Sequence, residues 1–399
     1  MIGSAKQGKE ARGANERALA HIEKIAWVKP IEGADNIELI GILGWVCIAK
    51  KGEFKENDMC IYFEIDSKLP ETEWSEFMRP KHFKVKTMKL GKFNVISQGL
   101  ALPISEIPEL QGKEWEIGTD VTELLGVTYS VEEDNHRKSK NGDPNAKYKS
   151  MAARHQKLFK GKLFRWLMKK SWGRKLLFVF FGRKKDKPKA FPDWIVKTDE
   201  TRIENAPFYL ESTDPWIKTE KIDGTSSTYA IDFTKNKKGE FIVCSRNVRQ
   251  ADEKQECYHT CGNVYWEMVG KYNIETILRV IAKAQEAKRI VLQGEIYGDA
   301  IQGNPYKLKE RRFAAFNLII DGNRLSSIDA KTILDRYDIP FVPIIDTEYY
   351  LPIDMETFKL EADGTSTISN VKREGFVYRS LDGTKSFKNV SREFLLKHS

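Results

Sequence analysis

Cysteine is scarce in this chain, which has only 5 in 399 residues. So few cysteines, in an odd number, do not suit a secreted disulfide scaffold, and we expect a reducing compartment. Long apolar runs are also missing, since none approaches the roughly 18 residues that a membrane span needs. The N-terminal residues lack the apolar core of a signal peptide. We therefore expect an intracellular protein, cytoplasmic or nuclear, that is neither secreted nor inserted in a membrane.

Proline and glycine are too infrequent for a collagenous or low-complexity chain, with 14 and 27 residues. Hydrophobic residues make up 41% and charged residues 31% of the sequence. That apolar content supports one or more packed cores and excludes wholesale disorder. At roughly 100–200 residues per domain, the length predicts two domains or three.

Positive charge is concentrated in one segment. Residues 136–190 hold 19 Lys and Arg against 2 Asp and Glu, a net charge of +17, which leaves −8 for the rest of the chain. Residues 136–156 have the composition of a linker, whereas residues 157–187 interleave cations with aromatic and aliphatic residues as a basic amphipathic helix does. That helix has three candidate partners: a neighbouring domain, a nucleic acid or a membrane surface.

The N-terminal region has the pattern of a small β domain. Three stretches rich in β-branched and aromatic residues are separated by turn residues: 37–49, 59–65 and 93–102. Trp45, Tyr62 and Phe63 are candidates either for its core or for stacking platforms that bind nucleic acid bases.

The chemistry-bearing residues lie in the last 200 positions. A probable strand leads into Lys221-Ile222-Asp223-Gly224, a K-x-D-G pattern that is weak evidence alone. Five further patterns follow it in order: Ser245-Arg246-Asn247, Gly294-Glu295, Phe316 within Arg311–Ile320, Glu374-Gly375-Phe376-Val377, and Lys385-Ser386-Phe387-Lys388. The ordered set is a strong signal.

Other patterns in this half point to no site. Residues 263–288 have the periodicity of one helix packed on a core. Cys257, His259 and Cys261 lack the second ligand pair of a structural zinc site. No Walker-type phosphate loop is present, which argues against a P-loop ATPase.

The six patterns resemble the signature motifs of the covalent nucleotidyltransferases, which include polynucleotide ligases and mRNA capping enzymes. The stretch 30–70 and residues 120–127 resemble an OB-type barrel, and 191–205 resemble the segment ahead of the nucleophile in the fifth RNA ligase family. An OB domain ahead of the catalytic domain also favours that family. The resemblance covers 19–128 and 190–399.

The resemblance implies an α+β fold, with an OB-type β-barrel followed by an ATP-grasp-like nucleotidyltransferase domain of antiparallel sheets and helices. We expect a flexible N-terminus over 1–18, the OB domain over 19–128, a basic linker over 129–189 and the adenylyltransferase domain over 190–399.

The resemblance makes Lys221 the nucleophile that attacks the α-phosphate of ATP to form a lysyl-AMP phosphoramidate. Because free lysine has a pKa of about 10.4, such an amine needs help to lose its proton. Lys385 and Lys388 would lower the Lys221 pKa and stabilise charge on the α-phosphate. The family places its two lysines one residue apart, whereas two residues separate them here.

The remaining nucleotide contacts are implied in the same way. Phe316 would stack on the adenine, Arg246 would contact ribose or phosphate, and Glu220 would line the nucleotide site. Several of these residues have a plainer alternative: Phe316 as a core residue, Arg246 in a surface ion pair, Glu374 and Lys388 as exposed strand residues, and Asp223-Gly224 as a hairpin turn.

Three carboxylates around one phosphate would repel it and one another unless a cation lies among them. Asp223, Glu295 and Glu374 form that set, and their oxygens suit Mg²⁺ or Mn²⁺. The resemblance implies that they hold the metal largely through its water molecules.

The expected function is ATP-dependent RNA ligation by a monomer. Its partner would be RNA, or a duplex containing RNA, with a 5′-phosphate and a 3′-hydroxyl, most simply a nick with RNA on the 3′-hydroxyl side. The alternatives are a DNA ligase or capping guanylyltransferase, a non-catalytic RNA-binding protein, and a membrane-surface protein that uses 157–187.

Overall fold

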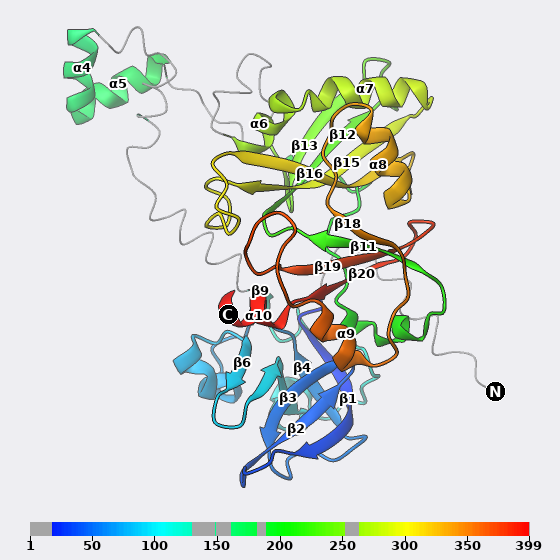
Figure 1. The fold of residues 1–399 in the computed structure, drawn as a ribbon. Helices are drawn as coiled ribbons and strands as arrows, with labels where there is room; N and C mark the ends of the chain where they lie inside the picture. Colours follow the sequence, from blue (N-terminus) through cyan, green and yellow to red (C-terminus); the bar gives the residue numbers. More distant parts are fainter. Residues whose placement is uncertain (1–17, 130–147, 149–160, 182–188, 252–262, 399) are drawn as a thin grey trace.

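The structure is a computed structural model that describes residues 18–129, 148, 161–181, 189–251 and 263–398. Figure 1 shows three β-rich layers along the molecule: the N-terminal barrel at one end, a four-stranded sheet in the middle and a seven-stranded sheet at the other end. The predicted flexible N-terminus, 1–18, lies outside the described residues except for its last position, as does the candidate zinc pattern at 257–261.

The N-terminal domain is built on a five-stranded antiparallel sheet in the order β3-β2-β1-β4-β8. Its strands are β1 (Ala20–Pro30), β2 (Ile37–Ile42), β3 (Trp45–Lys50), β4 (Met59–Phe63) and β8 (Leu100–Pro103). Two small sheets complete it: β5 (Ser67–Lys68) with β9 (Thr128–Tyr129), and β6 (Thr87–Leu90) with β7 (Val95–Gln98). The stretches 37–49 and 93–102, each predicted as one strand, are each two strands.

Tight turns split both stretches. Leu43 adopts a φ of 54° between β2 and β3, and Gly99 adopts a φ of 97° between β7 and β8. A Cβ on Gly99 would lie 2.5 Å from the Tyr62 ring, so only glycine fits there. Trp45, Tyr62 and Phe63 are at most 1% exposed. They belong to the core of the barrel and are not stacking platforms.

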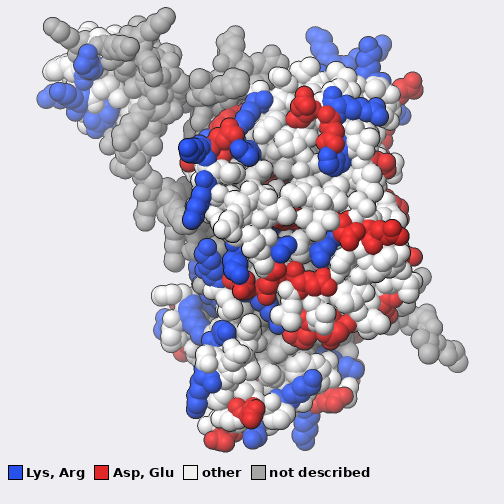
Figure 2. Space-filling view, in the orientation of Figure 1, with Lys and Arg blue, Asp and Glu red and all other residues white. Residues whose placement is uncertain are grey.

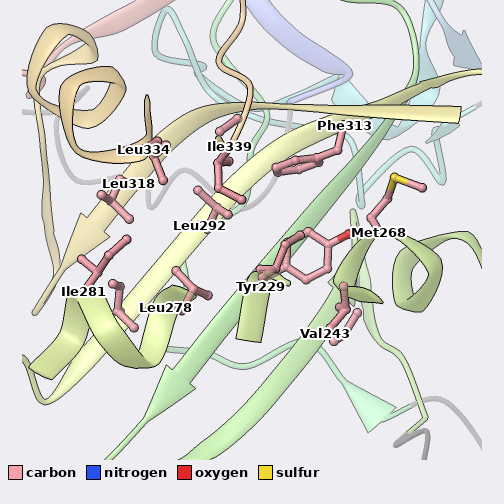
Figure 3. Packing of buried hydrophobic residues seen from close by; sticks show 14 of the residues in the cluster. Tyr229, Val243, Met268, Leu278, Ile281, Leu292, Phe313, Leu318, Leu334 and Ile339 are labelled. Atoms are coloured by element: carbon pink, nitrogen blue, oxygen red, sulfur yellow. The ribbon is translucent and has the colours of Figure 1, made fainter. Parts of the chain in front are cut away.

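The seven-stranded sheet forms one half of the catalytic domain, in the order β10-β14-β13-β12-β15-β16-β17. Its strands are β10 (Lys189–Ala190), β12 (Thr225–Asp232), β13 (Glu240–Ser245), β14 (Val248–Arg249), β15 (Arg289–Gly298), β16 (Arg311–Ile320) and β17 (Asn323–Arg324). Helices α6 (Val264–Lys271), α7 (Ile274–Ala284) and α8 (Ser327–Asp335) pack on it through the apolar cluster of Figure 3. The single helix predicted over 263–288 is two, because Asn273 adopts a φ of 48° between them.

The four-stranded sheet is the other half, in the order β18-β11-β19-β20. Its strands are β11 (Trp216–Lys221), β18 (Ile344–Tyr349), β19 (Gly375–Ser380) and β20 (Ser386–Val390). Phe358 of α9 (Met355–Glu361) packs against it with Trp216, Tyr378 and Phe387. Helix α10 (Arg392–His398) follows β20, and 3₁₀ turns occupy Glu73–Lys81, Ile104–Glu106, Pro108–Leu110, Ile203–Asn205 and Pro207–Glu211.

The basic segment contains two short helices, α4 (Lys162–Lys169) and α5 (Ser171–Phe181), rather than the one helix predicted over 157–187. Leu177 is buried against Phe164, Leu167, Met168 and Phe178. The pair carries no Asp or Glu, and Figure 2 shows it in blue and white. Among the described helices, none has the length and apolar character to cross a membrane.

A buried lysine joins the two domains. Lys359 of α9 is 1% exposed and donates to the Gln98 side chain at 2.8 Å and to the Gly44 carbonyl at 3.3 Å, both in the barrel. Its ammonium lies 3.6 Å from Glu204, which is also 1% exposed. Burial lowers the Lys359 pKa against the opposing pull of Glu204. The barrel is therefore held to the catalytic domain by a buried charge with specific partners.

We expect Lys359→Met to weaken this junction, because it leaves Glu204 buried without its cation. Breaking a buried pair on one side costs about 3–5 kcal/mol. Thermal unfolding should show the midpoint falling by several degrees. In Lys331→Met, which removes an exposed helical pair with Asp335, stability should change by no more than about 0.5 kcal/mol. Equal midpoints for the two variants would contradict this account.

Candidate active site

The K-x-D-G pattern lies where the chain passes from the four-stranded sheet to the seven-stranded sheet of the catalytic domain. Strand β11 ends at Lys221, and β12 of the other sheet begins at Thr225. A Cβ on Gly224 would lie 2.3 Å from the Ile296 carbonyl oxygen, so the chain crosses closely over β15 only with glycine there. The backbone N–H of Asp223 donates to the Tyr306 hydroxyl at 2.8 Å.

Strand pairing places Glu374 beside Lys221. In the β11–β19 register Lys221 lies opposite Gly375, the residue that follows Glu374. The Lys221 ammonium lies 2.6 Å from Glu374 Oε1, with side-chain exposures of 26% and 13%. Gly375 adopts a φ of 147°, and a Cβ there would lie 2.2 Å from the Asn389 carbonyl oxygen. The glycine in this pattern is therefore required by the close approach of β20.

Glu295 and Phe316 reach the same place from the seven-stranded sheet. Glu295 lies on β15 opposite Ser226, and its Cγ would be 2.9 Å from a Cβ on Gly224. Phe316 on β16 packs on the cluster that contains Ile222 and Tyr306. The ring is partly exposed beside the residue that follows the candidate nucleophile. It is therefore part of this hydrophobic cluster, and its predicted stacking on adenine stays a prediction.

Two cations meet on one carboxylate at this site. Lys388 of β20 lies 2.7 Å from Asp199 Oδ1, and Arg246, just after β13, lies 2.9 Å from Asp199 Oδ2. Lys388 thus comes from the four-stranded sheet and Arg246 from the seven-stranded one. At least one residue of each of the six sequence patterns therefore lies where parts of the two sheets come together.

Family models match both domains. Residues 19–104 match an OB-fold domain, and residues 214–397 match the RNA ligase family. The second domain of this chain therefore matches the RNA ligase family, and the protein is an ATP-dependent ligase. The search of curated proteins gave no match.

Solved structures match this chain over almost all of its length. This ligase is similar to the Naegleria gruberi RNA ligase solved with PPi, at 28% identity and a TM-score of 0.74, covering 96% of this chain and 99% of the other. A lysine-to-methionine mutant of that enzyme, solved with AMP and Mn, gives 29% identity, a TM-score of 0.73 and the same coverage. A lysine-to-alanine mutant with ATP and Mn gives 27%, 0.71, and 95% and 99%.

These matches confirm the predicted fold class, an OB-type domain followed by an α+β catalytic domain of antiparallel sheets and helices. Among the predicted enzyme classes they support the RNA ligase, because the catalytic domain matches the RNA ligase family. The predicted domain boundaries stay predictions. The structure adds that β9 of the barrel extends to Tyr129, one residue past the predicted boundary.

Two predicted site residues lie apart from the Lys221 cluster. Lys385 is exposed in the turn between β19 and β20, where its backbone N–H donates to Ser380 Oγ. Glu220 is 1% exposed and accepts from the Ser366 hydroxyl and from the backbone and hydroxyl of Thr367. Alternation along β11 turns it away from Lys221. Its carboxylate holds the loop before β19, and its predicted place in the nucleotide site stays a prediction.

The charge around Lys221 also differs from the prediction. Lysines were expected to lower its pKa, but the groups that act on it in the structure are carboxylates. Burial favours the neutral amine, while Glu374, Glu295 and Asp223 outweigh burial and raise the Lys221 pKa. The protein alone therefore keeps this amine protonated.

The same crowding also raises the pKa values of two of the carboxylates, which favours their neutral form. Burial, followed by repulsion from Glu374, raises the pKa of Asp223 to about 7. Burial raises the pKa of Glu295 to about 8, against the attraction of Lys221. Glu374 Oε2 is buried and accepts no hydrogen bond. Crowded, under-satisfied oxygens of this kind suit a hard divalent cation.

A direct ligand cage is absent from the described part of the chain, where no three His, Cys, Asp or Glu side chains lie close enough to hold a metal ion. The predicted role of Asp223, Glu295 and Glu374 is contact largely through metal-bound water, which needs no such cage. The donor set therefore fits a hydrated Mn²⁺ or Mg²⁺, and the assignment of these ligands stays a prediction.

The sequence patterns did not indicate two residues that lie at this site, Asp199 and Tyr306. Asp199 lies in the 191–205 stretch that contributed to the resemblance, but no spacing rule ties it to Arg246 or Lys388. Tyr306 lies in the loop between β15 and β16 and belongs to none of the six sequence patterns. A β bridge between Arg202 and Lys388, with Lys388 N–H donating to the Thr201 carbonyl at 2.8 Å, places Asp199 there.

The raised carboxylate pKa values predict how stability depends on pH. Asp223 and Glu295 hold protons more tightly in the folded than in the unfolded chain, where their pKa values are 3.8 and 4.5. The free energy of unfolding therefore loses a contribution as the pH rises from about 4 through about 7 and 8. In metal-free protein, Asp223→Asn and Glu295→Gln should each flatten the fall of the unfolding midpoint between pH 5 and 8.

Asp382→Asn is the matched control, because hydrogen bonds led by Ser380 lower the Asp382 pKa to about 2, outside that range. Its pH profile should run parallel to that of the wild type. Profiles of Asp223→Asn and Glu295→Gln that also run parallel to the wild type would show that these carboxylates are not crowded.

Proposed function

We propose that this RNA ligase activates RNA ends through AMP carried on Lys221, with ATP as the nucleotide. The observation that supports it best is the placement of Lys221 where two sheets meet, 2.6 Å from Glu374 and among the carboxylates of Asp223 and Glu295. The similar Naegleria gruberi enzyme was solved with ATP and Mn, with AMP and Mn, and with PPi. These structures support ATP and Mn²⁺ as ligands of the present protein.

The proposed reaction has three steps. The neutral Lys221 amine forms a bond to the α-phosphorus of ATP, that phosphorus loses its bond to the bridging oxygen, pyrophosphate leaves and the amine gives up a proton. A 5′-phosphate oxygen of the RNA then attacks the AMP phosphorus, and the N–P bond breaks as the lysine regains a proton. Finally a 3′-hydroxyl attacks the activated 5′-phosphate and loses its proton as AMP departs.

The side chains around Lys221 have distinct parts in these steps. Lys388 and Arg246 supply positive charge where negative charge develops on the phosphates, the effect that contributes most in such sites. Phe316 offers a partly exposed ring beside Ile222 on which an adenine can stack. Glu374, already paired with Lys221, holds the amine in place.

Asp223, Glu295 and Glu374 would hold a divalent cation. When bound, it would neutralise their charge and draw negative charge from the phosphates. Its positive charge would also offset the carboxylates that raise the Lys221 pKa, which favours the neutral amine.

We propose that the substrate has a 3′-hydroxyl and a 5′-phosphate and that it is a nick with RNA on the 3′-hydroxyl side. This follows the family resemblance and the domain order. The intracellular location and the monomeric state stay predictions.

Lys221→Ala should lose all covalent labelling. Wild-type protein incubated with α-labelled ATP and Mn²⁺ should gain one AMP, visible on a denaturing gel and as an intact-mass increase. Lys331→Ala, on the surface of α8, should label like the wild type. Labelled Lys221→Ala, or unlabelled wild type, would rule out the mechanism.

Nicked duplexes that differ only at the 3′-hydroxyl end test the substrate. A nick with RNA at that end should be sealed at least about tenfold faster than one with DNA, because only RNA offers a 2′-hydroxyl for recognition. Equal rates would contradict the proposed substrate and leave the lysyl-AMP mechanism standing.

A further inference from the structure

Arg246 is held from two sides, and one of them is the N-terminal domain. Its guanidinium carbon lies 5.6 Å from the centroid of the Tyr129 ring, within cation–π range. Tyr129 ends β9 and packs on the barrel core that contains Leu69 and Val127. On the other side, Asp199 Oδ2 lies 2.9 Å from Arg246. The barrel thus touches a candidate phosphate-binding cation.

Asp199 also connects Arg246 to Lys388. One carboxylate oxygen serves each cation, at 2.9 Å and 2.7 Å. Arg246 and Lys388 carry like charge, and the carboxylate that contacts both offsets their mutual repulsion. Asp199 itself is fixed by the backbone bridge beside it, between Arg202 and Lys388.

An arginine at this position needs such support. The Arg246 side chain is 43% exposed, so most of its rotamers are open to it when nothing holds it. Fixing a free arginine side chain costs conformational entropy, and this cost slows the reaction unless the protein restrains the side chain before ATP binds. Tyr129 and Asp199 limit that freedom before any phosphate binds.

We propose that Tyr129 and Asp199 are positioning residues for the adenylylation step, and that through Tyr129 the OB domain fixes a phosphate-binding cation of the catalytic domain. The inference rests on the proposed function of Lys221 and on Arg246 and Lys388 as phosphate contacts. It gives the OB domain a part in the chemistry of the first step, separate from any contact it makes with RNA.

Single-turnover adenylylation separates positioning from folding. With full-length protein, ATP and Mn²⁺, three quantities are measured: the rate constant at saturating ATP, the half-saturating ATP concentration and the fraction of protein labelled. Asp199→Asn should lower the rate constant about tenfold, because misplaced groups lose transition-state stabilisation. The half-saturating concentration should stay the same or fall, because a negative charge near the phosphates is gone.

Tyr129→Leu should lower the same rate constant about three- to tenfold, and Tyr129→Phe should restore it, because the ring and not the hydroxyl faces the guanidinium. Tyr350→Leu and Asp335→Asn, exposed residues outside the site, are the matched controls and should behave like the wild type.

Rate constants within about twofold of the wild type for both Asp199→Asn and Tyr129→Leu would overturn the proposal. So would a loss confined to the labelled fraction, which indicates a folding defect, or an equal loss in Tyr129→Phe and Tyr129→Leu. Wild-type protein that forms no lysyl-AMP would instead remove the proposed function, and this inference with it.

Discussion

The site depends on the pairing of β11 with β19, which brings the Lys221 amine within 2.6 Å of Glu374. Lys221 is the last residue of its strand, and Gly375 opposite it allows β20 to pass closely, since a Cβ there would lie 2.2 Å from the Asn389 carbonyl oxygen. The chain then crosses to the second sheet over Gly224. Two glycines and one strand register therefore decide where Lys221, the proposed nucleophile, lies relative to its acidic neighbours.

The acidic neighbours create a charge imbalance that the chain does not resolve by itself. Asp223 and Glu295 retain protons well above the usual range of a carboxyl, and Glu374 keeps one buried oxygen without a hydrogen bond. Lys221 is correspondingly kept protonated. A site with this imbalance is suited to receive a divalent cation and an anionic nucleotide together, because each offsets the charge that disfavours the other.

The barrel is integrated with the catalytic domain rather than tethered to it. Lys359 reaches Gln98 and Gly44 in a nearly solvent-free junction, Trp45 Nε1 donates to Asn205 at 2.6 Å, and Tyr129 lies against Arg246. Leu395 of α10 packs into the barrel core beside Trp45. The two domains thus share buried polar contacts, apolar packing and one side of the active site.

Local sequence determined the strands at 59–65, 240–244 and 311–320 and the nucleophile motif, because alternation and turn residues act over a few positions. It could not separate β2 from β3 or α6 from α7, since one residue with positive φ divides each pair. The positions and contacts of Glu220, Lys385 and Asp199 were decided by tertiary structure alone. Tertiary pairing decides which face of β11 meets the acidic cluster and which carboxylate lies between Arg246 and Lys388. These pairings join segments up to about 190 residues apart, which no local pattern encodes.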